Sequence, residues 1–171
     1  MQKFHNNPKA IQDWIDEGER YKHDNELFAG KFCDINDKHC DFWASALRFI
    51  RLGKGDCDEV LALSHYSLEG DGIGLFLKHV GNPSNKKDKN RGHAVYIYKG
   101  DNGFYGIISI NKSEWEPPIY ANTSEAALSY TGSGYNYYKF ITFPSNNILL
   151  DNYGSIKKYA EFSEKFYFPK Q

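Results

Sequence analysis

Residues 93–110 read HAVYIYKGDNGFYGIISI, and this stretch decides the class of fold. Two runs rich in β-branched and aromatic residues, 93–99 and 104–110, flank the segment GDNG at 100–103. Such side chains favour strands, and a short connection containing Gly, Asp and Asn is typical of an antiparallel hairpin. We therefore expect a hairpin here, within a sheet that is mainly antiparallel.

Helical patterns precede this hairpin. Asn7 is typical of an N-cap for a helix over 8–22, whose first residue is a proline. Residues 23–37 are polar and predict a loop. A second apolar pattern runs over 38–52 at helical spacing and meets Gly53, a residue type that commonly ends helices. Helices first and antiparallel strands afterwards predict an α+β fold in which the helices pack on the sheet.

A third helix is predicted to begin in the segment GDCDEV at 55–60. Asp56 is a good N-cap residue, which places Cys57 in the first turn. Apolar residues further along share a face with Cys57, so we expect an amphipathic helix that is buried on the cysteine side. Glycines at 70, 72 and 74 are expected to end it.

The rest of the chain gives weaker patterns. They predict a strand over 75–80, a mobile basic loop over 81–92, a short helix over 124–130, a strand over 137–143 and a final amphipathic helix over 155–166. No internal repeat or boundary interrupts them, so we expect a single domain over 1–171.

Charge and composition narrow the classes of partner. The 171 residues carry 21 Lys and Arg against 22 Asp and Glu, for a formal net charge of -1. This balance gives no argument for a nucleic-acid partner, and no apolar run has the length of a membrane span or a signal peptide. We therefore expect no nucleic-acid or membrane partner and a cytoplasmic location, in a bacterium or in the host cell if the chain is phage-encoded.

The cysteines are three in number, Cys33, Cys40 and Cys57. An odd count favours a reducing compartment and free thiols over a disulfide framework. Cys33, His39 and Cys40 can be read as a metal cluster, but their spacing matches no Cys-x-x-Cys or His-x3-His zinc pattern. We expect neither a metal nor an organic cofactor.

Cys57 is the candidate nucleophile. A thiol at a helix N-terminus meets free N–H groups and the positive end of the helix dipole, which favour the thiolate. A base must accompany it, and a third group must orient that base. His93 opens a hairpin strand and is the preferred base. Ser109 and Asn111 share one face of the paired strand. Because an amide oxygen accepts an imidazole N–H well, Asn111 is preferred and Ser109 is the alternative.

Three segments carry a resemblance to a known family: GDCDEVLALSHYSL at 55–68, GHAVYIY at 92–98 and YGIISIN at 105–111. Together they resemble the core of the transglutaminase-like cysteine peptidase superfamily, over about residues 40–125. The bacterial and phage branch, with an acid directly after the cysteine, is the most similar. The resemblance implies a papain-like fold of helices on an antiparallel sheet.

The resemblance also implies roles for single residues. Cys57 matches the nucleophile, His93 the base, and Asn111 or Ser109 the third member of a triad. No Gln stands a few residues before Cys57 as an oxyanion donor. The backbone N–H of Cys57 would have to serve, and Trp43 is a candidate second donor.

Two functions follow as hypotheses. The first is a thiol-dependent hydrolase or acyl transferase that acts on an amide bond of a protein or peptide: a cysteine peptidase, amidase or deamidase. The second is a catalytically inactive relative that binds a protein through exposed aromatic residues. The aromatic candidates for that surface are Trp115, Tyr120, Tyr135, Tyr137 and Tyr138.

Overall fold

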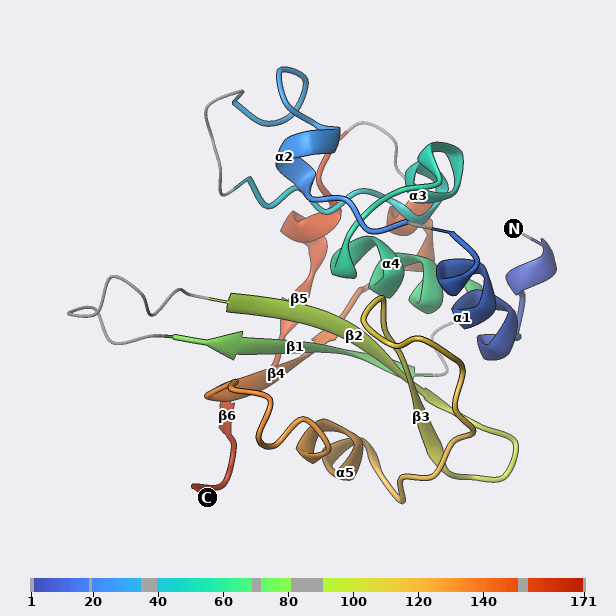
Figure 1. Cartoon of the computed structure of the whole chain (residues 1–171), viewed down its shortest axis with the longest axis vertical. Coiled ribbons are helices and arrows are strands. Elements are labelled where there is room, and N and C mark those ends of the chain that lie inside the picture. Colours follow the sequence, from blue (N-terminus) through green and yellow to red (C-terminus); the bar gives the residue numbers. More distant parts are fainter. Residues whose placement is uncertain are drawn as a thin grey trace.

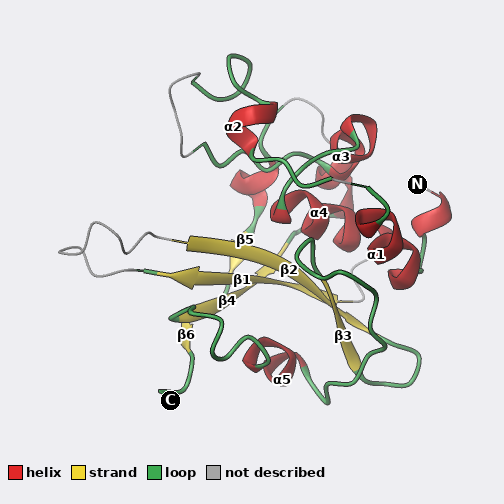
Figure 2. Ribbon diagram, viewed as in Figure 1, coloured by secondary structure: helices red, strands yellow, loops and turns green. Residues whose placement is uncertain are grey.

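The structure is a computed structural model that describes residues 2–18, 20–34, 40–68, 72–80, 91–150 and 154–170. The strands form one sheet, and helices pack on both of its faces (Figures 1 and 2). The helices are α1 (Pro8–Asp16), α2 (Asp24–Leu27), α3 (Ala46–Leu52), α4 (Cys57–Ser67) and α5 (Thr123–Leu128). The strands are β1 (Gly72–His79), β2 (Arg91–Lys99), β3 (Tyr105–Ile108), β4 (Tyr137–Thr142), β5 (Glu161–Phe162) and β6 (Phe166–Tyr167). Short 3-10 turns occur at Gln2–Phe4, Asn146–Leu150 and Ile156–Tyr159.

The sheet has six strands in the order β3-β2-β1-β4-β5, and β6 also pairs with β4. Every pair is antiparallel. The hairpin predicted from 93–110 is β2 and β3, with Tyr96 opposite Ile108. The α+β class and the mainly antiparallel sheet are confirmed.

The two faces of the sheet bury different helices. On one face, α4 packs with Tyr96 and Tyr98 of β2 and with residues of α1 and α3. On the other face, Val95 and Ile97 pack with Ala126 of α5. Figure 1 shows α1, α3 and α4 on one side of the sheet and α5 on the other. The α4 helix is buried on almost every side rather than amphipathic, because the sheet and the other helices enclose it.

The predicted helix ends are confirmed at three positions. The Asn7 side chain accepts from the N–H of Ala10 and caps α1. Gly53 ends α3 with a φ of 66°, a left-handed conformation that glycine adopts without strain. Asp56 caps α4 and makes Cys57 its first residue.

Other predicted boundaries are wrong. Helix α1 ends at Asp16 instead of continuing to 22, and the predicted loop 23–37 contains α2. Helix α3 begins only at Ala46, since Ser45 caps it. The final helix over 155–166 is instead a 3-10 turn followed by β5 and β6. Most of the predicted loop over 81–92, from 81 to 90, lies outside the described residues. Its last two residues, 91 and 92, belong to β2.

Two glycines that were expected to end a helix instead lie inside β1. A Cβ atom on Gly74 would stand 2.7 Å from the Leu61 Cδ1 atom, and one on Gly72 would stand 2.2 Å from the Ile97 carbonyl oxygen. Both distances are shorter than real contacts allow. The missing side chain at Gly74 therefore lets α4 approach the sheet closely.

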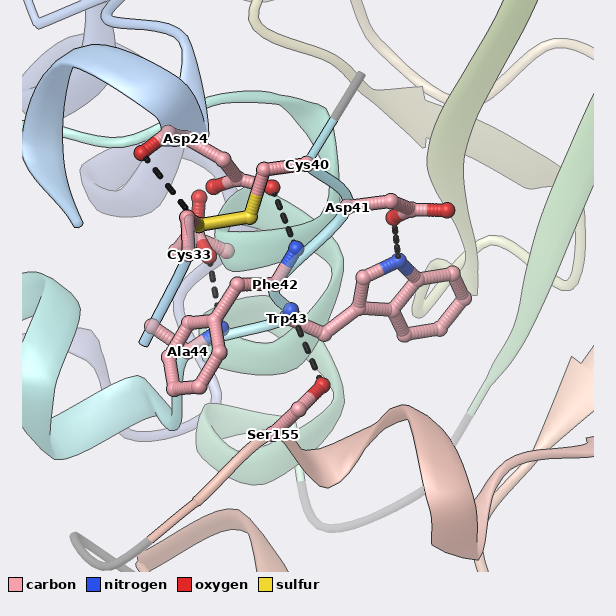
Figure 3. Close-up of a disulfide and its surroundings, with 9 residues drawn as sticks. Asp24, Cys33, Cys40, Asp41, Phe42, Trp43, Ala44 and Ser155 are labelled. Atoms are coloured by element: carbon pink, nitrogen blue, oxygen red, sulfur yellow. Dashed lines mark hydrogen bonds between the residues drawn. A yellow bond between two sulfur atoms is a disulfide. The ribbon is translucent and has the colours of Figure 1, made fainter. Parts of the chain in front are cut away.

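Cys33 and Cys40 form a disulfide with Cα atoms 5.7 Å apart, so the prediction of free thiols is wrong for this pair (Figure 3). Cys57 is the free cysteine. The bond also removes both sulfur atoms from the metal cluster considered above, and His39 lies outside the described residues. None of the described helices combines the length and the apolar character needed to cross a membrane.

Candidate functional site

Cys57 is placed by a complete helix cap. The Asp56 side chain accepts from backbone N–H groups of the first turn, and the Glu59 carboxylate accepts from the Asp56 N–H at 2.7 Å. Such a reciprocal cap fixes where the helix starts. The thiol is therefore held at the N-terminus of α4, as the sequence predicts.

The Cys57 sulfur lies against strand β2. Its side chain is half-buried and packs on a cluster that contains Leu61, Ala62 and Ala94. Burial is the largest influence on the pKa of the thiol and raises it, whereas the nearby backbone N–H of Ala94 lowers it by a smaller amount. Because Ala94 follows His93 in the chain, the thiol meets the strand at the residue next to the predicted base.

The His93 side chain projects to the other face of β2. Neighbouring residues of a strand point to opposite faces. Ala94 packs on the α4 side, whereas the His93 ring lies 6.4 Å from the ring of Tyr130, which belongs to the cluster on the α5 side. No hydrogen bond joins Cys57 to His93, both of which are described in full. The structure thus brings the two residues to adjacent strand positions without bringing their side chains into contact.

The two candidate orienting residues both contact His93. The Nε2 atom of His93 lies 2.9 Å from the Ser109 hydroxyl oxygen and 3.5 Å from the Asn111 amide nitrogen. The Ser109 hydroxyl also accepts from the Asn111 backbone N–H at 3.3 Å. The shorter contact belongs to Ser109, the residue that the sequence reasoning ranked second.

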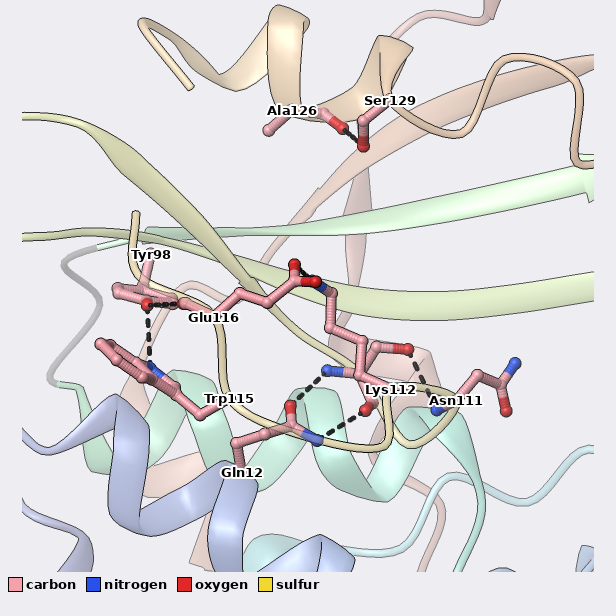
Figure 4. Close-up of polar contacts among 9 residues, drawn as sticks. Gln12, Tyr98, Asn111, Lys112, Trp115, Glu116, Ala126 and Ser129 are labelled. Carbon is pink, nitrogen blue, oxygen red and sulfur yellow. Dashed lines mark hydrogen bonds and ion pairs between the residues drawn. The ribbon is translucent and has the colours of Figure 1, made fainter. Parts of the chain in front are cut away.

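Gln12 is a residue of this site that the sequence motifs do not identify. Its side-chain amide donates to the Ser109 carbonyl oxygen at 3.1 Å and accepts from the Ser109 N–H at 3.1 Å. Figure 4 shows Gln12 reaching from α1 to the chain beside Asn111. Gln12 is fully buried. The signal available in the sequence was the position of a glutamine within the apolar stripe that contains Ile11 and Ile15.

A cavity of about 370 Å³ opens on the His93 side of the sheet. It is lined by His93, Ile107, Ser109, Asn111, Lys112, Tyr120, Ser129, Tyr130, Ser133 and Tyr135. All three predicted partners of the thiol border this space, and Cys57 does not. The tyrosines and serines after β3 complete the walls. The sequence marks only Tyr120 and Tyr135 among them, and it marks them for a binding surface rather than for this cavity.

Burial makes both reactive groups neutral at rest. It lowers the pKa of His93 to about 4, against a weak opposing effect of the Asp56 charge. Burial, followed by the Asp56 charge, raises the pKa of the Cys57 thiol well above its usual value. The effect of burial on the thiol thus runs opposite to the effect that the sequence predicts for the helix N-terminus, and it exceeds the effect of the Ala94 N–H.

The acids around Cys57 are also perturbed. Burial and the Glu59 charge raise the pKa of Asp24 to about 9, and burial and the Asp56 charge raise the pKa of Glu59 to about 8. Asp58, on the other side of the thiol, is buried as well. These residues form a buried acidic cluster behind the thiol.

Both N–H groups of Trp43, the candidate second oxyanion donor, are already hydrogen-bonded. Its indole N–H donates to Asp41 at 2.6 Å, and its backbone N–H donates to the Ser155 hydroxyl at 3.1 Å (Figure 3). The backbone N–H of Cys57, by contrast, belongs to the first residue of α4 and is one of the helix N–H groups without a partner inside the helix. This leaves the Cys57 backbone as the predicted oxyanion donor.

No family model matches the chain, and a search of curated proteins found no match. The resemblance to the transglutaminase-like superfamily therefore stays a prediction that depends on the residues described above.

Proposed function

We propose that this chain is a thiol-dependent enzyme of the transglutaminase-like type, a hydrolase or acyl transferase that acts on an amide bond of a protein or peptide. One observation carries the proposal. The helix-terminal sulfur of Cys57 meets β2 at Ala94, directly beside His93, whose imidazole contacts both Ser109 and Asn111.

The resting state sets the form of the mechanism. Since His93 is neutral and the thiol is protonated, the imidazole acts as a general base that takes the proton as the sulfur attacks the carbonyl carbon. The developing oxyanion is placed at the N-terminus of α4, where the Cys57 N–H donates. His93 then gives the proton to the leaving amine, a thioester remains on Cys57, and water or an amine resolves it.

This mechanism requires one rearrangement. The imidazole and the sulfur lie on opposite faces of β2, so the backbone of β2 at His93 must twist or shift before the ring can reach the thiol. Catalytic hydrogen bonds are often long or absent before substrate binds and form in the substrate complex. We therefore expect substrate binding in the cavity to displace the His93–Ser109 contact.

Acylation by an activated ester tests the proposal. We would incubate the protein with p-nitrophenyl acetate and follow the acetyl adduct on the Cys57 peptide by mass spectrometry. The expected result is fast acylation in wild type and a rate about 100-fold lower in His93→Ala. His79→Ala is the matched control, and it should react like wild type. Equal rates in wild type and His93→Ala would overturn the proposal.

The second candidate is a catalytically inactive protein-binding domain, and a different observation favours it. Of the predicted aromatic surface, Tyr138 is wrong because it is buried, and Trp115, Tyr120, Tyr135 and Tyr137 are only half-buried. Instead, Phe162, Phe166 and Tyr167 on β5 and β6 are exposed. Cys57→Ala separates the two functions. An enzyme loses its activity with this change, whereas a binding protein keeps its partner.

A further inference from the structure

Four carboxylates meet behind Cys57. Asp24 lies at the start of α2, and Asp56, Asp58 and Glu59 lie at the start of α4. One carboxylate oxygen from each residue lies within 4.8 Å of the other three. Two segments that are far apart in the sequence thus direct acids into one small volume.

This volume is shielded from water. Asp24, Asp58 and Glu59 are 3%, 4% and 1% exposed. In the part of the chain that the structure describes, no Lys or Arg forms an ion pair with any of the four acids. Like charges that are buried together without a counter-charge oppose folding strongly. The cluster therefore needs either bound protons or a bound cation to offset its charge.

Backbone groups fix these carboxylates without neutralising them. The Glu59 carboxylate accepts from the N–H of Ala44 and of Asp56, each at 2.7 Å. The second oxygen of Asp24, Oδ2, accepts from the Phe42 N–H at 2.6 Å. The geometry of the cluster is therefore set by the fold and does not depend on a bound group.

Two oxygens of the cluster have no partner. Asp24 Oδ1 and Asp58 Oδ2 are buried and accept no hydrogen bond. Most buried polar atoms in native proteins are hydrogen-bonded. Two unpartnered carboxylate oxygens in one acidic cluster are independent evidence for a ligand that binds oxygen and carries positive charge.

We propose that Asp24, Asp56, Asp58 and Glu59 bind a divalent cation of the hard, oxygen-preferring class, with Ca²⁺ the best fit. Ca²⁺ accepts six to eight oxygen ligands in a flexible geometry, and protein carboxylates are common among them. Mg²⁺ gives up its bound waters reluctantly, so a buried site built from protein carboxylates suits it less well. The site would tie α2 to the start of α4, and it does not depend on the proposed chemistry of Cys57.

A softer metal is the competing occupant. Asp56, Cys57 and Asp58 also offer three ligand atoms within 4.8 Å of one another. A thiolate ligand is typical of Zn²⁺ sites. We favour the hard cation because the four-residue set consists of oxygens alone and contains both unpartnered atoms.

Calorimetric titration of the chelator-treated full chain tests the site, with CaCl₂, MgCl₂ and ZnCl₂ as separate titrants. The thermal midpoint of unfolding is measured alongside. We expect one Ca²⁺ per chain, with Kd on the order of 10⁻⁶ to 10⁻³ M, and a rise in the midpoint with Ca²⁺. Asp24→Asn and Asp58→Asn should each weaken binding at least about tenfold, roughly the loss of one charge-assisted ligand. Asp101→Asn, a matched change on an exposed turn, should bind like wild type.

Each contrary outcome is distinct. No heat and no shift of the midpoint with any of the three salts would show that shared protons alone neutralise the acids, and it would overturn the site. Binding of Zn²⁺ that is lost in Cys57→Ala, with no binding of Ca²⁺, would also overturn it in favour of a thiolate site. Equal Ca²⁺ binding in wild type, Asp24→Asn and Asp58→Asn would place the ion elsewhere. Folding of the variants is checked by circular dichroism, and removal of a buried like charge should not impair it.

Discussion

The Nε2 atom of His93 lies 2.9 Å from the hydroxyl oxygen of Ser109, closer than it lies to the amide of Asn111. Ser109 is 1% exposed, and its hydroxyl is the principal polar neighbour of the imidazole. In the resting state, the ring is therefore oriented chiefly by a hydroxyl group.

This contact predicts an order of effects for the two candidate orienting residues. Ser109→Ala leaves a buried imidazole nitrogen without its near partner, so we expect a loss of roughly 1–3 kcal/mol in the free energy of unfolding. Asn111→Ala removes a weaker contact at an exposed residue and should cost less than about 1 kcal/mol. Urea unfolding of both variants measures this, and the reverse order would contradict the assignment.

The stability of the protein should depend on Gln12 at least as much as on the residues that contact His93. Gln12→Ala removes both bonds that hold the backbone of Ser109 and leaves two buried groups unpaired. We expect a loss of roughly 2–4 kcal/mol in the free energy of unfolding and slower acylation of Cys57. The exposed Gln2 provides the matched control, since Gln2→Ala should change neither quantity. An unchanged free energy of unfolding in Gln12→Ala would show that the two hydrogen bonds from Gln12 to the Ser109 backbone are dispensable.

The neutral imidazole predicts a specific pH dependence. Folding lowers the pKa of His93 from 6.5 to about 4, so the unfolded chain binds the proton more tightly. The stability contribution of the neutral imidazole is complete above pH 6.5 and is lost as the pH falls toward 4. Relative to His93→Gln, wild type should lose roughly 3 kcal/mol across this range.

Chemical unfolding at several pH values between 4 and 7.5 measures that difference. The opposing effect of the Asp56 charge is already part of the His93 pKa of about 4. His23→Gln, a change at an exposed histidine, should track wild type at every pH. If the difference in free energy of unfolding between wild type and His93→Gln does not change with pH, the pKa of His93 is the same in the folded and unfolded protein, and the prediction is wrong.

The disulfide predicts a thiol count and a stability. A native sample kept without reductant should show one reactive thiol per chain after unfolding in denaturant, and Cys57→Ala should show none. Cys40→Ser should lower the free energy of unfolding by about 2.5 kcal/mol, the value expected for a loop this short. Three thiols in the unreduced protein would instead favour the free cysteines that the sequence count predicts.

Local chemistry made part of this fold predictable. The hairpin, the caps at Asn7 and Asp56 and the left-handed Gly53 each depend on a few neighbouring residues, and each is found where the sequence places it. The start of α3 was not predictable in this way. Residues 42–44 continue the apolar pattern of the helix but are buried as an irregular segment, because Asp24 and Glu59 bind their backbone N–H groups.

The candidate site was predictable as a set of residues but not as a geometry. The sequence placed His93 on a strand, which is confirmed, and both orienting residues on the partner strand, which is wrong. Strand β3 ends at Ile108, so Ser109 and Asn111 contact His93 from the segment that follows the strand. The sequence could not say which face the imidazole occupies, since a shift of one residue in register reverses every side chain. The disulfide was hidden because an odd count of cysteines does not prevent two of them from pairing.

The two hydrogen bonds between Gln12 and the Ser109 backbone join residues 97 positions apart in the chain. Contacts over such separations form late, because a long loop must close before they can be made. During synthesis, the Cys57 thiol therefore exists well before the groups that hold His93 can assemble. Any activity of Cys57 therefore requires the completed fold. A chain shortened at α1 or in the segment after β3 would keep Cys57 but would lose the residues that hold His93 in place.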